Sequence, residues 1–477
     1  MRRFKVVSKI IAAILVIILP FAAVPTIALC LPAQYDESFT SALCAKVDRL
    51  AEINEAKIVV VGGSSVAFGL DSALIERYTG MPVVNFGVYA ALGTKLMLDL
   101  SRDYIKEGDV IVLAPELDAQ TLSMYFNAGT TLQATDGRAD ILSHVPFEHL
   151  FSLLGASWGL ASDKISYIQS GTSPSTTGAY DPDSFNEYGD IVYERYENVM
   201  SLYYDPNTAI NLSPDILDPE FAEYLNDYIR YCEKNGASVF FSWCPINEIA
   251  ITEDTKGDER IAEFESFMQE SIDCTFISSI NDYILAPGYF YDTNFHLNDA
   301  GVTARTVALT RDLLLELGIP SAVTEIVPEP PALPELDLRY FDEDENARYF
   351  EYASLEGGAY MITGVKDEYK HLTTLTVPLG YNTYKVTHIG ARAFEGTALE
   401  TLILTEDTNV RNIMNGAFKG ASSLKALYVL YPDSEVIAPP ADFAGVASGF
   451  TVYVPESWLN CAMYYWGERG LKFEYIN

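Results

Sequence analysis

The sequence predicts a doubly wound α/β domain with a parallel sheet, preceded by a transmembrane helix and followed by a small repeat solenoid. Three observations lead to this prediction. Short apolar runs that suit buried parallel strands alternate with amphipathic segments up to residue 318. An apolar stretch without charged residues follows four basic residues at the N-terminus. A motif recurs at a fixed interval near the C-terminus.

The N-terminal segment, residues 1–32, is expected to anchor the chain in a membrane. Four basic residues precede an apolar run from Ile10 to Leu31, which is about 22 residues long. At about 1.5 Å per residue, such a run crosses a hydrocarbon core of roughly 30 Å. The basic residues before it place the rest of the chain outside the cytoplasm, as a single-pass protein of the cell membrane. A cleaved secretory signal and a buried core helix are the alternatives.

Residues 33–318 are expected to form the α/β domain. After a first helix over 35–56, its elements follow in this order: strand 57–61, helix 71–78, strand 82–86, helix 94–106, strand 110–114, helix 221–234, strand 238–243 and helix 299–316. The strand candidates are short and almost continuously apolar, as in a sheet that is buried on both faces. Asp71 or Ser72 is a suitable N-cap for the helix over 71–78.

Two segments differ from this alternating pattern. Residues 119–220 are rich in Tyr, Ser, Asp and Gly, and long insertions in α/β folds often lie over the carboxyl ends of the strands, where ligands bind. A lid over a binding site and a surface elaboration both fit this composition. Residues 319–340 contain five prolines among acidic and small residues, so they are expected to form an extended linker.

The C-terminal residues, 341–477, contain an internal repeat. The pattern Val-x-x-Ile-x-x-x-Ala-Phe-x-Gly begins at Val386 and recurs 24 residues later at Val410. A degraded third copy contains Phe443-x-Gly445. Units of this length bury their apolar faces against each other and form a solenoid. The repeats resemble the BspA-type leucine-rich repeats of bacterial cell surfaces, which implies a surface for adhesion or for binding a protein ligand.

Charge and cysteine content restrict the partners and cofactors. The chain has 31 basic and 66 acidic residues and a formal net charge of −35. Nucleic acid is therefore not an expected partner, because phosphate binding needs concentrated Lys and Arg. No pair of the six cysteines has the C-x-x-C spacing of a zinc or redox site. We expect neither a metal ion nor a cofactor.

Two turns in the α/β domain are candidates for catalytic groups. The segment Gly62-Gly63-Ser64-Ser65 follows the first expected strand, where it can present a hydroxyl at the carboxyl edge of the sheet. Asn85 and Gly87 end the second strand, where backbone N–H groups can point at a developing oxyanion. An N-capping serine and an ordinary glycine turn explain the same patterns without catalysis.

A third candidate precedes the last expected helix, where Asp292 lies four residues before His296. A hydroxyl nucleophile needs a base of near-neutral pKa, and that base needs a carboxylate that fixes its tautomer. A lone Asp-His pair is more often structural. It gains weight from the serine at the end of the first strand in the same domain.

The order of these three pieces resembles the SGNH (GDSL-like) hydrolases over roughly residues 55–318. The similarity is greatest to membrane-anchored, extracytoplasmic members of Gram-positive bacteria, of the DltD-like and alginate-acetylation types. It implies that Ser64 is the nucleophile, His296 the general base and Asp292 its orienting carboxylate. It also implies that the N–H groups of Ser64 and Gly87 form part of the oxyanion hole, with Asn85 beside them.

Three further points concern the roles that this resemblance implies. Ser65 is the rival nucleophile, because either hydroxyl could occupy the apex of the turn. The family offers an asparagine to the oxyanion hole from its third block, but this chain has Glu116, and a carboxylate donates a hydrogen bond only when protonated. Glu116 could instead bind substrate or cap a helix. Three residues, rather than the usual two, separate Asp292 from His296, so their hydrogen bond depends on a local kink.

The expected function is that of an extracytoplasmic serine esterase or O-acyltransferase. It would act on acyl esters, chiefly acetyl esters, of a cell-wall or surface polysaccharide through an acyl-enzyme. The expected partners are the membrane and a carbohydrate or acylated cell-wall polymer. The alternative is a non-catalytic adhesion or scaffold protein that binds through its repeats.

Overall fold

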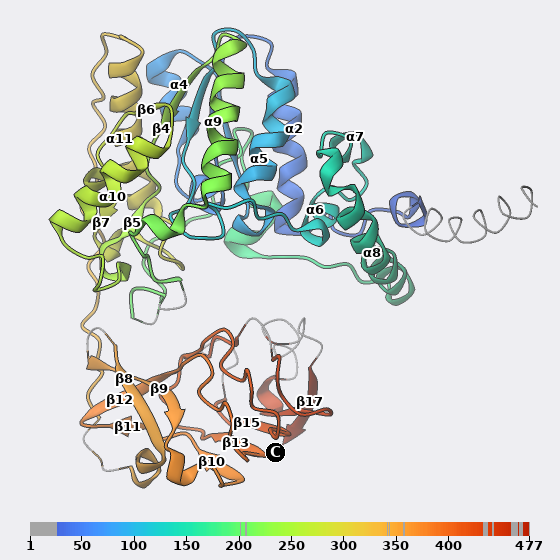
Figure 1. The fold of residues 1–477 in the computed structure, drawn as a ribbon, viewed down its shortest axis with the longest axis vertical. Helices are drawn as coiled ribbons and strands as arrows, with labels where there is room; N and C mark the ends of the chain where they lie inside the picture. The colour runs from blue at the N-terminus through green and yellow to red at the C-terminus, as the bar shows by residue number, and fades with distance from the viewer. Residues whose placement is uncertain are drawn as a thin grey trace, which may run out of the picture. The chain divides into compact units, whose positions relative to one another are not determined.

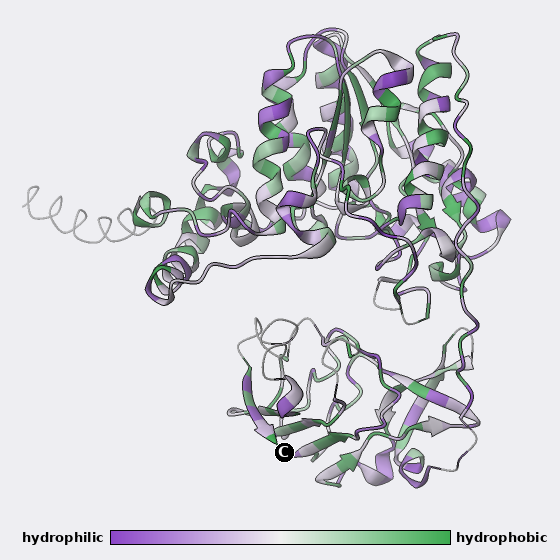
Figure 2. Ribbon diagram, turned by 180° about the vertical axis from the view of Figure 1, so that it is seen from behind, coloured by the Kyte–Doolittle hydropathy of each residue, from purple (hydrophilic) through white to green (hydrophobic). Residues whose placement is uncertain are grey.

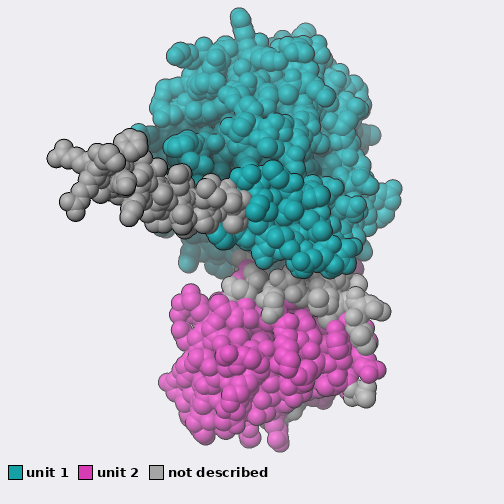
Figure 3. Space-filling view, turned by 90° about the vertical axis from the view of Figure 1, so that its right-hand side faces the viewer, with its two compact units in different colours: residues 1–333 teal, residues 334–477 magenta. Residues whose placement is uncertain are grey.

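The computed structural model describes residues 26–200, 202–205, 208–340, 342, 344–355, 358–432, 437–440, 443–458, 466 and 471–476. The chain divides into two compact units, unit 1 (residues 1–333) and unit 2 (residues 334–477), shown in Figures 1 and 3. Most of the expected membrane anchor lies outside the described residues. In the part of the chain that is described, no helix has the length and hydrophobicity needed to cross a bilayer.

Unit 1 is an α/β structure built on a five-stranded parallel sheet. The strand order is β2-β1-β3-β4-β6, and every pairing in it is parallel. The strands are β1 (Ile58–Gly62), β2 (Val83–Gly87), β3 (Val110–Leu113), β4 (Ser238–Phe241) and β6 (Thr275–Phe276). The chain order reverses between β1 and β3, and open α/β sheets bind ligands beyond the carboxyl ends of the strands at such a point.

Helices cover both faces of this sheet (Figure 1). One face carries α2 (Ala42–Glu52), α5 (Thr94–Ser101) and α9 (Pro219–Lys234), and the other carries α4 (Ser72–Thr79) and α11 (Asp299–Glu316). Under α4 and α11, alternate strand residues pack with leucines of α11 into one buried cluster, which includes Ile58, Val60, Val110, Val112, Leu309 and Leu313. The strands are mostly green in the hydropathy colouring of Figure 2, as expected for a sheet buried on both faces.

The observed elements lie close to those predicted. Helix α11 has the expected bounds, and Asp71 caps α4 by accepting a hydrogen bond from the Leu74 N–H at 3.1 Å. The expected helix over 35–56 is shorter, because Phe39–Ser41 form a 3-10 turn before α2 begins. Further elements of unit 1 are α10 (Asp258–Ser271) and a two-stranded sheet of β5 (Ile246–Asn247) and β7 (Ile284–Leu285).

The insertion over residues 119–220 has a helical first half and a mostly irregular second half. Its helices are α6 (Ala128–Ala134), α7 (Ala139–Leu142) and α8 (Leu150–Ser170). The second half returns to the sheet, where the Ile191 N–H donates to Ala67 O at 3.2 Å and the Asn85 N–H donates to Tyr188 O at 3.0 Å. The insertion therefore reaches the carboxyl ends of β1 and β2.

The proline-rich segment after α11 begins as part of unit 1. Glu325 pairs with Arg77 at 2.7 Å and accepts a hydrogen bond from the Tyr78 hydroxyl at 2.5 Å. The boundary between the two units falls at residues 333 and 334, inside the segment expected to be a linker. Its first part is thus attached to α4.

Unit 2 contains a parallel sheet whose three central strands stack at the same sequence interval. One sheet has the order β10-β13-β15-β16-β17, with all pairs parallel. In it, Leu402 pairs with Leu427 and Leu427 pairs with Val452, so the interval is 25 residues. The strands are β10 (Thr374–Thr376), β13 (Thr401–Leu404), β15 (Ala426–Val429), β16 (Thr451–Pro455) and β17 (Lys472–Ile476).

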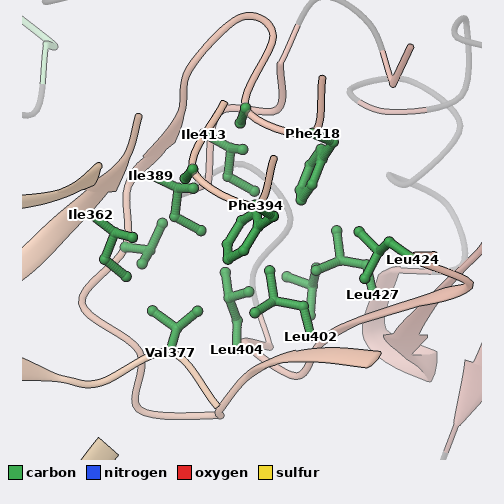
Figure 4. Packing of buried hydrophobic residues seen from close by; sticks show 14 of the residues in the cluster. Ile362, Val377, Ile389, Phe394, Leu402, Leu404, Ile413, Phe418, Leu424 and Leu427 are labelled. Atoms are coloured by element: carbon green, nitrogen blue, oxygen red, sulfur yellow. The ribbon is translucent and has the colours of Figure 1, made fainter. Parts of the chain in front are cut away.

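A second sheet completes unit 2, and a single apolar core fills the space between its strands and turns. This sheet has the order β11-β12-β9-β8, with β14 beside β12. The strands are β8 (Phe350–Ser354), β9 (Tyr360–Val365), β11 (Gly380–Tyr381), β12 (Tyr384–Ile389) and β14 (Asn412–Ile413). In the core, the repeated phenylalanines Phe394 and Phe418 stack with their ring centroids 5.8 Å apart, above the leucines of the parallel strands (Figure 4).

Candidate functional site

The candidate site lies at the carboxyl ends of β1, β2 and β3. Ser64 begins a short helix, α3 (Ser64–Ala67), directly after β1 and its two glycines. Gly87 is the last residue of β2 and pairs with Gly62 of β1. Glu116 follows β3 by three residues. Because parallel strands end at the same edge, three predicted site residues meet there.

His296 and Asp292 form the best-defined polar pair of the site. Nδ1 of His296 lies 2.8 Å from Oδ1 of Asp292. The intervening backbone forms a tight loop, in which the His296 N–H donates to Thr293 Oγ1 at 3.0 Å and the Tyr291 N–H donates to His296 O at 2.9 Å. When the Nδ1–H donates to Asp292, Nε2 of the neutral ring is the free acceptor, which is the form that a general base requires.

Two aromatic residues hold this pair in place. The Tyr180 hydroxyl donates to Oδ2 of Asp292 at 2.7 Å and lies 3.4 Å from Nδ1 of His296. Burial, together with the Asp292 charge, raises the pKa of Tyr180 well above its usual value, so the hydroxyl keeps its proton. The Phe68 ring stacks on the His296 ring, with centroids 3.9 Å apart and planes 2° from parallel.

The two serines differ in exposure. Ser64 is 8% exposed, and its hydroxyl makes no hydrogen bond with a described residue. Ser65 is fully buried, and its Oγ has no hydrogen-bond partner among the described residues. The Phe68 N–H donates to Ser64 O at 2.8 Å, so the ring that stacks on His296 is one helical turn from Ser64. His296 thus reaches the turn that carries the serines without a hydrogen bond to either hydroxyl.

Glu116 occupies a backbone donor of the same turn. Its Oε1 accepts a hydrogen bond from the Ser65 N–H at 2.6 Å, and its carboxylate packs against Gly63 so closely that a side chain there would collide with it. Its Oε2 is buried and has no hydrogen-bond partner among the described residues. Burial raises the pKa of Glu116, although the Ser65 N–H and the nearby Ser65 side chain oppose that rise.

Arg305 holds the turn from the opposite side. It is buried on α11, and its Nη1 donates to Ser65 O. Nε and Nη2 of this side chain have no partners among the described residues. Burial lowers the pKa of Arg305, whereas the nearby Tyr283, Cys244 and Glu116 act against this change. A buried cation and a buried carboxyl group thus flank the serine turn.

Asn85 and Gly87 belong to a buried hydrogen-bond network. Asn85 Nδ2 donates to Val66 O and to Asp190 Oδ1, both at 2.8 Å. Asn85 Oδ1 accepts from Lys46 Nζ and from the Gly87 N–H, both at 3.3 Å. These contacts position the end of β2 against the serine turn. The role of Asn85 and Gly87 toward a substrate stays a prediction.

Sequence reasoning missed several residues that shape the site. Tyr180 is one of many tyrosines in the insertion, and nothing local in the sequence marks it as a partner of Asp292. Arg305 carried a signal, because it lies four and eight residues before Leu309 and Leu313 and therefore on the buried face of α11. A charged residue on such a face usually has a specific partner.

The described residues include no group of three or more His, Cys, Asp or Glu arranged to hold a metal ion. Comparison of the chain with models of protein families, with curated proteins and with solved structures finds no match.

Proposed function

We propose that unit 1 is a serine esterase or O-acyltransferase that acts outside the cytoplasm on acyl esters of a cell-wall or surface polysaccharide, chiefly acetyl esters. The observation that best supports this is the 2.8 Å contact between His296 and Asp292. The His296 ring stacks on Phe68, which follows Ser64 by one helical turn at the carboxyl edge of a parallel sheet. Ser64 is preferred over Ser65 as the nucleophile because only Ser64 retains some exposure.

In the proposed mechanism, His296 moves protons and Asp292 holds its ring. Nε2 of His296 takes the proton of the Ser64 hydroxyl while Oγ attacks the ester carbonyl carbon. The tetrahedral intermediate then expels the sugar oxygen, which takes the proton from His296, and the acyl group stays on Ser64. Water, or a second sugar hydroxyl, gives its proton to His296 and attacks the acyl-enzyme. His296 then returns this proton to Oγ of Ser64 as the acyl–oxygen bond breaks, which releases acid or a new ester and restores the serine.

The oxyanion hole of this mechanism depends on the protonation of Glu116. An ionised carboxylate beside the turn would repel the developing oxyanion. A protonated Glu116 can instead donate from Oε2, which has no partner among the described residues. Because burial raises the pKa of Glu116, its proton is retained above the usual pH range of a glutamate. It would thus supply the hydrogen bond that an asparagine supplies in the SGNH hydrolases.

We also infer that residues 1–32 are a single-pass anchor and that unit 2 is a leucine-rich-repeat solenoid. The apolar run before Thr26 supports the anchor. The 25-residue interval between stacked parallel strands and the stacking of Phe394 on Phe418 support the solenoid. This architecture would present the repeats outside the cell, where they could hold a carbohydrate or a protein ligand.

A non-catalytic adhesion or scaffold protein is the second candidate. Two observations favour it: neither serine hydroxyl is hydrogen-bonded to His296, and Glu116 already occupies the Ser65 N–H. The first is common in unliganded hydrolases, whose catalytic hydrogen bonds often tighten only with substrate. The hydrogen bond between Glu116 and the Ser65 N–H opposes catalysis only if Glu116 is ionised, because a protonated Glu116 can still donate to the oxyanion.

The test is hydrolysis of p-nitrophenyl acetate and of acetylated sugars by the full chain in detergent. We expect Ser64→Ala to lower kcat/KM by a factor of about 10³ or more, because it removes the nucleophile. Ser65→Ala is the matched control and should retain activity within about tenfold. Equal turnover by the parent chain and Ser64→Ala would reject Ser64. A fluorophosphonate adduct on Ser65 would show that Ser65, and not Ser64, is the nucleophile.

A further inference from the structure

Helix α8 of the insertion carries an exposed apolar face. Phe151, Trp158 and Ile165 are seven residues apart, a spacing that aligns side chains along one side of a helix. All three are exposed, and Phe147, just before the helix, is 81% exposed, as is Phe151. The only exposed charged residue of α8, Asp163, lies five residues after Trp158 and therefore across the helix from this line.

The start of the described chain is attached to the same region. Lys164 of α8 is buried, and its Nζ donates to Ala28 O at 3.0 Å and to Leu31 O at 2.8 Å. Its charge is balanced by Asp136, whose Oδ1 lies 2.6 Å away. Residues 26–31 consequently lie beside α6 and α8, as Figure 1 shows.

This attachment joins the exposed face to the apolar N-terminal run. Ile27 and Leu29 are 48% and 40% exposed, although both belong to the last part of that run. Leu29 lines an apolar hollow together with Phe147, Leu150 and Leu153 from the beginning of α8. The last residues of the run Ile10–Leu31 thus lie beside Phe147. We call the face defined by Phe147, Phe151, Trp158 and Ile165 the α8 face.

We propose that the α8 face rests in the interfacial layer of the lipid bilayer in which residues 1–32 are anchored. The proposal rests on that inferred anchor, because a bilayer that holds the part of the run before Thr26 begins beside the α8 face. An exposed apolar patch of this kind marks an interaction site. A helix with one apolar side that is too short or too polar to span lies in the plane of the interface.

The charge of the helix indicates how it would bind. Amphipathic helices that bind anionic lipid carry Lys and Arg on their polar side, whereas α8 has Lys164 buried and only Asp163 exposed. The whole chain has a formal net charge of −35, which anionic lipid repels. Docking would therefore be driven by burial of the apolar side chains and would not need anionic lipid.

Membrane docking of the α8 face would also bring the candidate site close to the bilayer. Tyr180, which donates to Asp292, follows the end of α8 by ten residues in the same insertion. The intervening chain is held to unit 1 where the Thr176 N–H donates to Glu37 O at 3.0 Å. A docked α8 face would keep this site close to the bilayer, where an acylated polymer next to the membrane is within reach.

The experiment uses the full chain in phosphatidylcholine nanodiscs that contain a photoactivatable lipid with its reactive group near the headgroup. After illumination, lipid adducts are located by mass spectrometry of the peptides. We expect at least about tenfold more adducts on residues 147–168 than on α11. Residues 10–31 report on the anchor separately in the same sample.

The matched variants are Phe147→Ser with Phe151→Ser on the α8 face and Leu315→Ser on α11. Leu315 is 77% exposed, and α11 lies on the side of unit 1 away from α8 in both Figures 1 and 2. The double variant should lower adducts on α8 by about tenfold or more, because a buried Phe contributes at least that factor in partitioning. Leu315→Ser should leave them unchanged. All three side chains are exposed, so folding is retained, which thermal unfolding checks.

Three results would overturn the proposal. Adducts on residues 10–31 with no excess on 147–168 would reject the α8 face while keeping the anchor. Protection of α8 from hydrogen exchange without lipid adducts would assign the face to another part of this chain or to a second copy. Adducts that require anionic lipid would contradict docking by apolar burial. None of these results depends on esterase activity, so they are distinct from a failure of the proposed function.

Discussion

The serine turn of unit 1 and the stacked strands of unit 2 build their buried interiors in opposite ways. In unit 1, Glu116 meets the Ser65 N–H across 51 positions of sequence and Arg305 meets Ser65 O across 240. In unit 2, Leu402, Leu427 and Val452 stack at a constant 25-residue interval. The first interior is polar and needs the whole unit to close. The second is apolar and is assembled from neighbouring segments.

This difference predicts different responses to mutation. Removing one partner from a buried polar network leaves the others unpaired, and each unpaired group has a large desolvation cost. Removing apolar atoms from a stacked core leaves a cavity that neighbouring side chains partly fill. The predictions that follow test this contrast, from the largest expected effect to the smallest.

Asp190→Ala should break the polar interior of unit 1. The Asp190 carboxylate accepts hydrogen bonds from the Ser72 N–H, the Ser72 hydroxyl and Asn85 Nδ2, at 2.7 to 2.8 Å. Its loss leaves these donors without this acceptor and removes the negative charge near the buried Lys46. We expect the free energy of unfolding of unit 1 to fall by about 4 kcal/mol. Hydrogen exchange of peptides from β1 and β2 measures this loss.

The control for Asp190→Ala is Asp183→Ala, which removes an exposed carboxylate from the same insertion. It should change exchange in β1 and β2 very little. Equal effects of the two substitutions would show that the buried network does not hold the insertion to β2.

Leu427→Ala should open a cavity in the core of unit 2. Leu427 is fully buried between Leu402 and Val452 of the neighbouring strands. We expect a loss of about 3 kcal/mol in the free energy of unfolding of unit 2, with unit 1 unaffected. Hydrogen exchange of β13 and β16 reports it. Lys425→Ala, at an exposed position two residues earlier, should have little effect, and a similar loss there would contradict a stacked core.

His388 should make the stability of unit 2 depend on pH. It is buried, its Nε2 has no partner among the described residues, and burial lowers its pKa to about 4. Between its ordinary pKa and this lowered value, the unfolded chain binds the proton more strongly, so stability falls as pH falls. From pH 7 to 5 the free energy of unfolding of unit 2 should fall by about 2 kcal/mol more than in His388→Gln.

The exposed His371 is the matched control for His388 in the same unit. His371→Gln should leave the fall between pH 7 and 5 unchanged in urea unfolding followed by peptide-resolved exchange. If the free energy of unfolding of unit 2 falls equally between pH 7 and 5 in His388→Gln, the buried imidazole is not the cause of that fall.

Glu116→Gln tests whether the buried Glu116 side chain acts as a hydrogen-bond donor in catalysis. The raised pKa of Glu116 means that its proton, and hence its donor, is present at lower pH and is lost as pH rises through that pKa. Glutamine keeps an acceptor for the Ser65 N–H and donates at every pH. We expect kcat/KM for an acetyl ester to be about tenfold higher in Glu116→Gln than in the parent chain once the pH exceeds the raised pKa of Glu116. Asp118→Asn, two residues along, should change it less than about twofold.

The pH profile distinguishes the interpretations of Glu116. The general base is the same in the parent chain and in Glu116→Gln, so the two profiles should differ only where Glu116 changes its charge. The decline on the alkaline side should be lost in Glu116→Gln alone. Parallel profiles would mean that Glu116 does not act as a donor.

Local sequence patterns were enough to place most of the frame of unit 1. The continuous apolar runs predicted the positions of β1 to β4 within a few residues, and the cap at Asp71 predicted the start of α4. The resemblance to the SGNH hydrolases implied the pairing of Asp292 with His296, although their spacing made the hydrogen bond depend on a local kink, and the two side chains are in contact. Such features depend on interactions between near neighbours, which a sequence shows directly.

The insertion shows where that reasoning ends. Nothing near Tyr180 or Asp190 in the sequence indicates that one meets Asp292, 112 positions away, or that the other meets Ser72, 118 positions away. These contacts exist because the irregular second half of the insertion returns across the ends of β1 and β2. Long irregular segments have no periodicity from which such a path can be read.

The sequence alone determined that this chain contains buried parallel strands, a serine turn, an Asp-His pair and a repeated apolar motif, because each depends on local spacing. The tertiary structure decided what surrounds these features. It brought the Tyr180 hydroxyl to Asp292 and the Phe68 ring onto His296. It also brought Glu116 to the Ser65 N–H and Arg305 to the Ser65 carbonyl. The physical reason is that burial and charge at a site come from groups brought together only when the whole unit has closed.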